Sequence, residues 1–414
     1  MTTFDLQTRR VLAVRTATAF DWQRVLCVLF FFSGFPALIY QLTWQRALFR
    51  IFGVNIESVT IVVTAFMLGL GIGSLAGGWL SKRPGIRLLP LLAVIELMTG
   101  AFGLVSLATF ERVGALALGL PLAVLAVITL ALVIVPTLLM GATLPVLVSH
   151  LVRRSGNVGS SVGLLYYVNT LGAGAACLAC ALLLFPFLGM QHTVYVAVAI
   201  NGAVALGALL ANRRDRGDPA VAQADGPASL QRSSPALGLA PVLVLAVAGG
   251  FVSLSYEMFL FRAVSYASGS GAGAFAVTLS VFLVGLAAGA RQAGRDCETL
   301  TPAAIMRRPA WALMAASVVG LLFLPLLDHL AFLGGGLVGA AALSTYLIAR
   351  FWGSLLPYLA QLGIRSDERA GMSIALLYLA NILGSATGCV LTGFVLMDHL
   401  GLVALGMTLA VAGL

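Results

Sequence analysis

The sequence predicts an all-α, polytopic membrane protein, and its composition, its long apolar segments and an internal repeat all support this prediction. Of the 414 residues, 60% are hydrophobic and only 9% are charged, whereas soluble domains are about 45–50% apolar and about 25% charged. The mean hydropathy is +1.03. These values exclude a soluble enzyme, a nucleic-acid-binding domain and a disulfide-stapled secreted domain. The net charge of +9 is therefore a sign of orientation in the membrane.

Twelve segments are long and apolar enough to cross a bilayer, which takes about 20 residues each. They are residues 24–49, 57–80, 88–110, 117–150, 160–187, 192–211, 240–263, 272–293, 309–327, 332–362, 370–397 and 401–414. The fourth and tenth segments are longer than a span requires, so we expect them to tilt or break. The expected break points are Pro136, Gly141 and Pro145 in the fourth segment and Gly353 and Pro357 in the tenth.

The arginines predict how this chain is oriented. A twelve-span map places nearly all loop arginines on one side, and the opposite loops carry only Arg112 as a clear loop charge. By the positive-inside rule, both termini are expected in the cytoplasm and the protein in the inner membrane. Residues 1–23 are then a cytoplasmic segment, and the polar stretch 212–239 is a flexible cytoplasmic linker. The last span is short, which leaves open a truncated final helix.

The two halves of the chain, 24–211 and 240–414, are copies of one unit. A shift of 216 residues maps Gly34, Tyr40, Arg46, Phe66 and Gly73 onto Gly250, Tyr256, Arg262, Phe282 and Gly289. A shift of 212 then maps Pro145, Tyr166, Asn169 and Cys177 onto Pro357, Tyr378, Asn381 and Cys389. Each unit has six spans, an even number, so both units have the same orientation in the membrane. This is the 6+6 arrangement of the major facilitator fold, which has a cavity between its halves.

The loop after the second span adds to this expectation. The sequence Gly78-Trp-Leu-Ser-Lys-Arg-Pro-Gly-Ile-Arg87 resembles the facilitator loop G-x-L-a-D-R-x-G-R-R. Lys82 stands where that family has an acidic residue. The pairing that the acid makes with a neighbouring helix is therefore not expected here.

Several motifs resemble the membrane domain of spermidine synthase-like proteins, in which a facilitator-like module is fused to an aminopropyltransferase. They are Ser33-Gly34, Tyr40-Gln41, Trp44-Gln45-Arg46, Phe66 to Ser74, Met140 to Pro145 and Tyr167 to Ala173. The family's Tyr-Glu pair is Tyr40-Gln41 in the first repeat and Tyr256-Glu257 in the second. The resemblance implies a link to polyamines. It does not extend to the enzyme, because no G-x-G-x-x-G after a strand and no acidic catalytic loop follow the spans, so we expect no enzymatic activity.

Charged residues within apolar spans are costly, so each is a candidate for function. Glu96 and Glu257 have no acidic counterpart in the other repeat, where Ala312 and Gln41 stand. An acid beside aromatic rings suits an organic cation, through ion pairing and cation–π contact, and either acid is a candidate proton carrier. The predicted substrate-binding residues are Tyr40, Gln41, Trp44, Glu96, Tyr256, Glu257 and Arg350.

Other polar residues have a structural interpretation. Arg46 and Arg262 lie near the outer interface and are expected to extend to the head groups. Asn169 and Asn381 are expected to hydrogen-bond between helices, and Pro145 and Pro357 to shape hinges. We predict no metal and no cofactor, because Asp328-His329, Asp398-His399 and His192 match no ligand spacing.

Three functions remain open at this point. The first is a facilitator-like transporter of a small cationic, polyamine-like metabolite that works by alternating access. The second is a membrane anchor or substrate-feeding module for a separate, soluble aminopropyltransferase-like partner. The third is a structural or assembly module that transports nothing. In each case the lipid bilayer is the surrounding partner, and nucleic acid is not.

Overall fold

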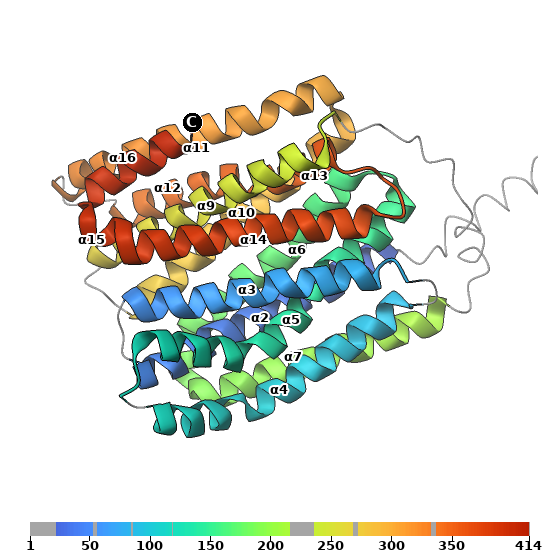
Figure 1. The fold of residues 1–414 in the computed structure, drawn as a ribbon, viewed down its shortest axis with the longest axis horizontal. Coiled ribbons are helices and arrows are strands. Elements are labelled where there is room, and N and C mark those ends of the chain that lie inside the picture. The colour runs from blue at the N-terminus through green and yellow to red at the C-terminus, as the bar shows by residue number, and fades with distance from the viewer. Residues whose placement is uncertain are drawn as a thin grey trace, which may run out of the picture.

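The structure is a computed structural model that describes residues 22–52, 56–83, 86–117, 119–215, 236–267, 272–332 and 337–413. Within these ranges the chain forms helices and no strand, so the predicted all-α membrane fold is confirmed (Figure 1). Nine helical segments of the described residues are long and apolar enough to span a membrane. The predicted segments 1–23 and 212–239 lie largely outside the described residues.

The first half comprises six crossings. Its elements are α2 (Trp22–Phe52), α3 (Ile56–Leu80), α4 (Leu88–Ala117), α5 (Leu122–Ser155), α6 (Val158–Ala179), the π-helical turn η1 (Cys180–Leu184) and α7 (Phe185–Asp215). The α6–η1–α7 segment turns at Gly189, whose φ of 68° lies in the left-handed region that favours glycine. This single helical segment therefore makes the fifth and the sixth crossing.

The second half repeats this plan. Its elements are α9 (Leu239–Ala267), α10 (Ala272–Thr299), α11 (Pro302–Phe332), α12 (Leu337–Gly353), α13 (Leu355–Gly363), α14 (Ala370–Leu391), η2 (Thr392–Leu396), α15 (Met397–His399) and α16 (Leu402–Ala412). The rare π-helical turn recurs, since the shift of 212 residues carries η1 onto η2. The sequence repeat is thus also a repeat of backbone geometry.

The two long spans differ from each other. The tenth is broken at Ser354, between α12 and α13, as predicted from Gly353 and Pro357. The expected break in the fourth span is wrong, because α5 runs without interruption through Pro136 and Pro145. Membrane helices tolerate proline where neighbouring helices and hydroxyl side chains satisfy the freed backbone groups. Next to Pro136, Thr137 Oγ1 donates a hydrogen bond to the carbonyl oxygen of Val133 at 2.7 Å.

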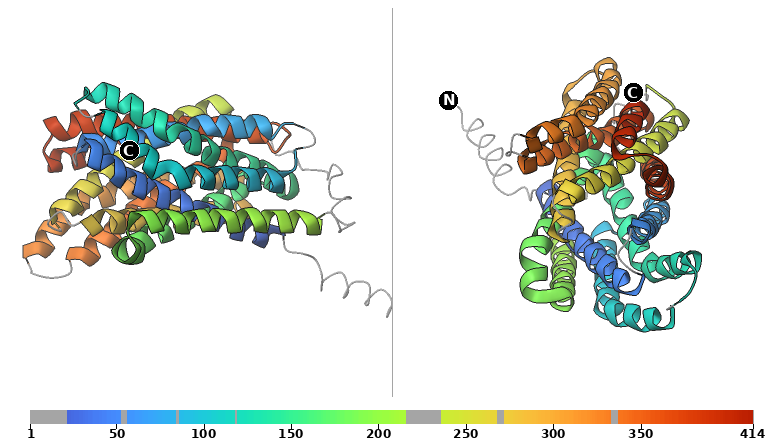
Figure 2. Two further views of the ribbon diagram at one scale, coloured as in Figure 1. Left: turned by 90° about the horizontal axis from the view of Figure 1, so that it is seen from below. Right: turned by 90° about the vertical axis from the view of Figure 1, so that its left-hand side faces the viewer.

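The halves meet along two helix pairs, α3 with α14 and α6 with α10. Figure 1 shows α3 and α14 side by side, and the end-on view in Figure 2 shows the helices of each half grouped together. Close helix crossings within each half rely on glycine. A β-carbon added to Gly73 would lie 2.1 Å from the carbonyl oxygen of Leu138, and one at the repeat-related Gly289 would lie 1.9 Å from that of Arg350.

One end of the molecule carries the loops 81–83, 156–157, 300–301 and 364–369, and we call it the basic end. Three hydrogen bonds join the two halves there. There Asn157 Nδ2 donates to the carbonyl oxygen of Cys297 at 2.8 Å, and the Gly159 amide donates to Gln361 Oε1 at 2.8 Å. Ser160 Oγ also donates to the Glu298 carboxylate. These three bonds, from the start of α6 to α10 and α13, hold the basic end closed.

Candidate functional site

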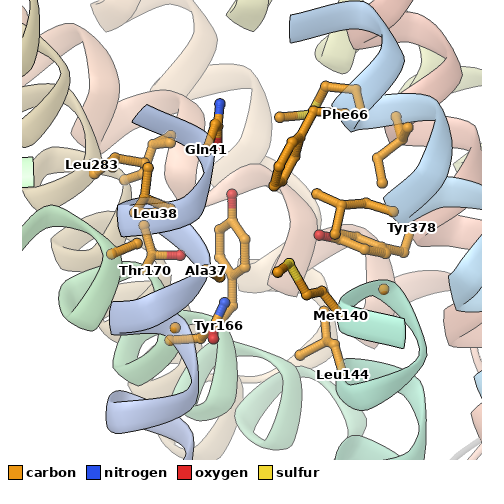
Figure 3. A pocket seen from close by; sticks show the side chains of 18 of the residues that line it. Ala37, Leu38, Gln41, Phe66, Met140, Leu144, Tyr166, Thr170, Leu283 and Tyr378 are labelled. Atoms are coloured by element: carbon orange, nitrogen blue, oxygen red, sulfur yellow. The ribbon is translucent and has the colours of Figure 1, made fainter. Parts of the chain in front are cut away.

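A cavity of about 220 Å³ lies between the two halves. Both repeats line it, through α2 to α7 from the first half and α9, α10, α12, α13 and α14 from the second. Figure 3 shows side chains from these helices pointing into it. A cavity at the interface of two repeats is where the facilitator architecture places a substrate site.

The charge of the cavity is one-sided. Glu96 of α4 and Glu257 of α9 line it, and no lysine, arginine or histidine does so among the described residues. Each half therefore contributes one carboxyl group, from positions that the repeat does not relate. A carboxylate at this depth in a membrane needs a compensating positive charge or strong hydrogen bonds.

Glu257 has neither a compensating positive charge nor a hydrogen-bond donor within the described part of the chain. No hydrogen bond and no ion pair joins its carboxylate to a described residue, although the residue is half-buried and lines the cavity. It also lines a smaller void next to the main cavity, together with its repeat counterpart Gln41. Glu257 is thus an open acceptor of hydrogen bonds that faces the cavity.

Glu96 is in a different environment. Ser33 Oγ donates to one of its carboxylate oxygens at 2.5 Å, and Asn201 Nδ2 donates to the other at 2.5 Å. Tyr40 Oη in turn donates to Asn201 Oδ1 at 2.8 Å. These four residues connect α2, α4 and α7, and we call them the Glu96 network.

Aromatic and amide side chains complete the lining. Tyr166 of α6 and Tyr378 of α14 are repeat counterparts, and Figure 3 shows both rings pointing into the cavity. Asn169 and Asn381 also line it. We expected these two amides to hydrogen-bond between helices. Instead, no hydrogen bond joins either side chain to a described residue, and both amides lie at the cavity wall.

Three predicted binding residues lie elsewhere. Tyr40, Trp44 and Tyr256 are fully buried and are not part of the cavity lining. Tyr40 stacks on Trp44 with 5.1 Å between ring centroids, and Trp44 Nε1 donates to Ser106 Oγ at 2.9 Å. One helical residue is a step of 100°, so Tyr40 and Trp44 share a face that is turned toward α4, while Gln41 faces the cavity. The same step separates Tyr256 from Glu257.

The arginines are also outside the cavity lining. The Arg46 guanidinium lies 4.0 Å from the Phe185 ring centroid, and that of Arg262 lies 4.7 Å from the Tyr266 centroid. Each guanidinium thus lies against an aromatic ring, and whether the two arginines also reach the head groups stays a prediction. Arg350 is half-buried near the end of α12 and forms no ion pair with the described residues. We therefore do not keep Arg350 in the site.

The two prolines that were predicted to shape hinges are not part of the cavity lining. Pro145 lies inside α5 and Pro357 in the first turn of α13, and both are buried behind the cavity-lining residues Leu144 and Leu356. The described residues contain no cluster of His, Cys, Asp and Glu that would hold a metal ion.

Sequence reasoning missed several polar members of the site, among them Ser33, Thr99 and Asn201. All three line the cavity beside Glu96. Asn201 had a usable signal, because it is an amide in an apolar span and the repeat places Gly413 at its equivalent position. Loss of repeat symmetry, which singled out Glu96 and Glu257, identifies it as well.

Several solved structures that resemble this chain are membrane transporters. A bacterial homologue of the iron transporter ferroportin, in an outward-facing state, superimposes with a TM-score of 0.64 and 12% identity, over 94% of this chain and 97% of that one. The proton:xylose symporter XylE gives 0.58 with 14% identity, over 94% and 92%. FucP in its outward conformation gives 0.59 with 15% identity, over 94% and 95%. At this identity the likeness shows the fold alone: the chain is a polytopic membrane protein with the major facilitator fold.

Sequence comparison gives a narrower likeness. No family model matches the chain. Polyamine aminopropyltransferase 1 of Streptomyces coelicolor is 28% identical over 178 residues, which are 43% of this chain and 32% of that protein. The chain thus matches about a third of the length of that curated relative.

Proposed function

We propose that this protein is a facilitator-type transporter of a small organic cation, of the polyamine-like class, that works by alternating access. The observation that carries the proposal is the charge of the cavity, which has two carboxyl groups and no basic side chain among the described residues. Such a cavity favours a cation and repels an anion. Transporter folds of the facilitator type bind substrate at this interface between repeats.

Glu257 is the proposed anchor for the cation. Removing an unpaired carboxylate from water costs several kcal/mol, and a bound ammonium group offsets that cost by charge pairing and hydrogen bonding. The amide oxygens of Gln41, Asn169 and Asn381 are free to accept further N–H bonds. The faces of Tyr166 and Tyr378 attract a cation as well. The lining thus supplies acceptors and aromatic rings, the two kinds of group that an amine recognises.

Two findings support a polyamine-like substrate in particular. The free acceptors of the cavity match N–H donors, which primary and secondary ammonium groups carry and quaternary ones lack. The local similarity to a curated polyamine aminopropyltransferase points to the same class of amine. A polyamine is also long and unbranched, which suits a cavity of about 220 Å³ that extends between two half-bundles.

The contacts at the basic end supply the conformational part of the proposal. By the positive-inside rule the basic end faces the cytoplasm, with both termini, and the protein lies in an inner membrane. The bonds from Asn157, Gly159 and Ser160 to the second half then close the cytoplasmic side. Transport requires that they open while the α3–α14 and α6–α10 pairs rock about the cavity.

Uptake of labelled spermidine into proteoliposomes tests the proposal. The parent is expected to accumulate spermidine, and Glu257→Gln is expected to lose at least tenfold in initial rate. Glu111→Gln is the matched control, because Glu111 is an exposed carboxylate near the far end of α4. A second variant, Glu257→Gln with Gln41→Glu, moves the carboxylate to the repeat-related position and is expected to restore part of the uptake. The proposal fails if the parent takes up neither spermidine nor other organic cations.

The second candidate is a membrane anchor or substrate-feeding module for a separate aminopropyltransferase-like enzyme. The similarity to Polyamine aminopropyltransferase 1 favours it over a purely structural role. Co-purification of the full chain with a soluble aminopropyltransferase-like protein, combined with no uptake in proteoliposomes, is the result that this candidate predicts. Absence of both partner and uptake would leave the assembly role.

A further inference from the structure

We propose that the Glu96 network is a proton-binding site that couples transport to proton movement, separate from the substrate anchor Glu257. The coupling of the proton to transport rests on the proposed function, whereas the binding of the proton does not. The site itself is argued from geometry and from a comparison of the two repeats. It assigns different cations to the two carboxyl groups of the cavity.

The first argument is the difference in hydrogen bonding. Both oxygens of Glu96 are occupied by donors, Ser33 Oγ and Asn201 Nδ2, each at 2.5 Å, and the residue is 3% exposed. A polyamine that used this carboxylate would have to share its oxygens with both donors in a site with almost no exposed surface. Glu257 has no such donors among the described residues, so it is the better place for a bulky ammonium group. A proton needs only one lone pair and no space.

The second argument comes from the repeat. The positions equivalent to Ser33 and Asn201 in the second half are Gly249 and Gly413, and Glu96 corresponds to Ala312 by the sequence shift and to Leu313 by the matched glycines Gly103 and Gly320. All three polar groups are absent there as a set. Tyr256, the counterpart of Tyr40, remains, and its hydroxyl is buried with no partner. Groups that are present together in one copy and missing together in the other act as a unit, and the fold evidently does not require that unit.

The third argument is the unoccupied hydroxyl beside the carboxyl group. Thr99 lies three residues after Glu96 on the same helix, lines the cavity and is 3% exposed. Its Oγ1 has no hydrogen-bond partner. Residues three apart on a helix are neighbours on one face. A protonated Glu96 has a donor that the carboxylate lacks, and Thr99 Oγ1 is an unused acceptor beside it.

No positively charged side chain described on the neighbouring helices pairs with the Glu96 carboxylate. Tyr40 is joined to it through Asn201, and Glu257, Tyr166 and Tyr378 share the cavity. The other ionisable side chains described on α4 and on its neighbours α2, α5 and α7 lie toward the ends of those helices. They are Arg24, Cys27, Arg46, Glu111, Arg112, His150, Arg153, Arg154, His192, Tyr195, Arg213 and Arg214. No hydrogen bond or ion pair joins any of them to Glu96.

The proposed step is a simple protonation. A proton from water that reaches the cavity binds one carboxylate oxygen of Glu96 and gives a neutral carboxylic acid. The hydroxyl of that acid then donates a hydrogen bond to Thr99 Oγ1 or, after rotation of the serine O–H, to Ser33 Oγ. On release the proton returns to water, and the Ser33 and Asn201 donors again stabilise the carboxylate. An alkali cation is less suited, because the oxygens of Glu96 and Ser33 are already engaged in hydrogen bonds and only Thr99 Oγ1 is without one.

Infrared difference spectroscopy of the full chain in liposomes tests the site without any substrate. A change of pH is expected to produce a carboxylic acid C=O band that Glu96→Gln removes and Glu257→Gln leaves. Asn201→Ala is expected to shift the frequency of this band, because it removes a donor. Tyr256→Phe is the matched control and should change nothing. The proposal is overturned if the band persists in Glu96→Gln, or if sodium ions rather than pH alter the Glu96 signal.

A transport assay then separates the two carboxyl groups. With labelled spermidine as the probe, Glu96→Gln is expected to abolish accumulation driven by a pH gradient and to retain spermidine exchange without a gradient. Glu257→Gln is expected to abolish both. If the parent transports nothing while the infrared result holds, the proposed function fails and the proton site stands. If uptake by Glu96→Gln still follows the pH gradient, the proton site is refuted and the transporter stands.

Discussion

Tyr40 and Tyr256 offer a matched pair of substitutions that tests the difference between the repeats. They occupy equivalent positions, both are fully buried, and each packs against a glycine of the third helix of its half, Gly103 or Gly320. Only Tyr40 has a hydrogen bond, to Asn201 at 2.8 Å. Replacing each by phenylalanine removes one hydroxyl from the same structural context.

The expected effects have opposite signs. Tyr40→Phe leaves Asn201 Oδ1 buried without its donor, and an unsatisfied buried group costs about 1–3 kcal/mol. Side-chain hydrogen bonds in membrane proteins average about 0.6 kcal/mol and reach about 1.7 kcal/mol, so we expect a loss near 1 kcal/mol. Tyr256→Phe removes a hydroxyl that is already without a partner. It should change stability little or raise it by up to about 1 kcal/mol.

The assay is equilibrium unfolding of the purified full chain by SDS in mixed micelles, followed by circular dichroism. The parent, both single variants and the double variant are compared. The effects should be additive within about 0.5 kcal/mol, because the two sites are in different halves and share no partner. Equal destabilisation by the two single variants would refute the reasoning, since it would mean that the Tyr40–Asn201 bond contributes nothing specific.

Two further predictions concern packing and the closed basic end. Gly73→Ala is expected to lower expression and to lower the free energy of unfolding by more than about 1 kcal/mol, because its β-carbon would lie 2.1 Å from a carbonyl oxygen. The control is Gly202→Ala, whose β-carbon would meet nothing within 4 Å. It should be neutral or stabilising by up to about 1 kcal/mol. Equal loss in both would contradict the packing account. Gln361→Ala removes the acceptor of the Gly159 amide and should speed hydrogen exchange at the start of α6 about fivefold, the equivalent of about 1 kcal/mol. The control Gln292→Ala breaks a bond within α10 alone and should leave that exchange unchanged. If Gln361→Ala does not alter the protection at the start of α6, the Gly159–Gln361 bond does not hold the basic end closed.

The fold was predictable from the sequence to an unusual extent, because a membrane restricts the chain to helices of a set length and the repeat gives each helix twice. The helix boundaries fall within a few residues of the predicted spans for most of the chain. The continuous α5 is the main exception. Proline predicts a lost backbone bond, but whether the helix breaks depends on how neighbouring helices pack against it, and a single sequence does not specify that packing.

The site was predictable in part. Charge within an apolar span and loss of symmetry singled out Glu96 and Glu257, and both line the cavity. Tyr40 and Trp44 were grouped with Gln41 by their closeness in sequence, although a step of 100° per residue turns them to another face. Which face of a helix meets the cavity depends on how the helix is rotated in the bundle. A single sequence does not specify that rotation when all faces are apolar.

Binding of spermidine to the purified protein is the most direct test of the central claim, that the cavity between the repeats recognises a cation through Glu257. Isothermal titration of the full chain in detergent measures it without requiring transport. The account predicts one saturable site in the parent, a loss of at least tenfold in affinity in Glu257→Gln, and affinity close to that of the parent in Glu111→Gln. Unchanged affinity in Glu257→Gln, or a preference of the parent for an anion over spermidine, would contradict it.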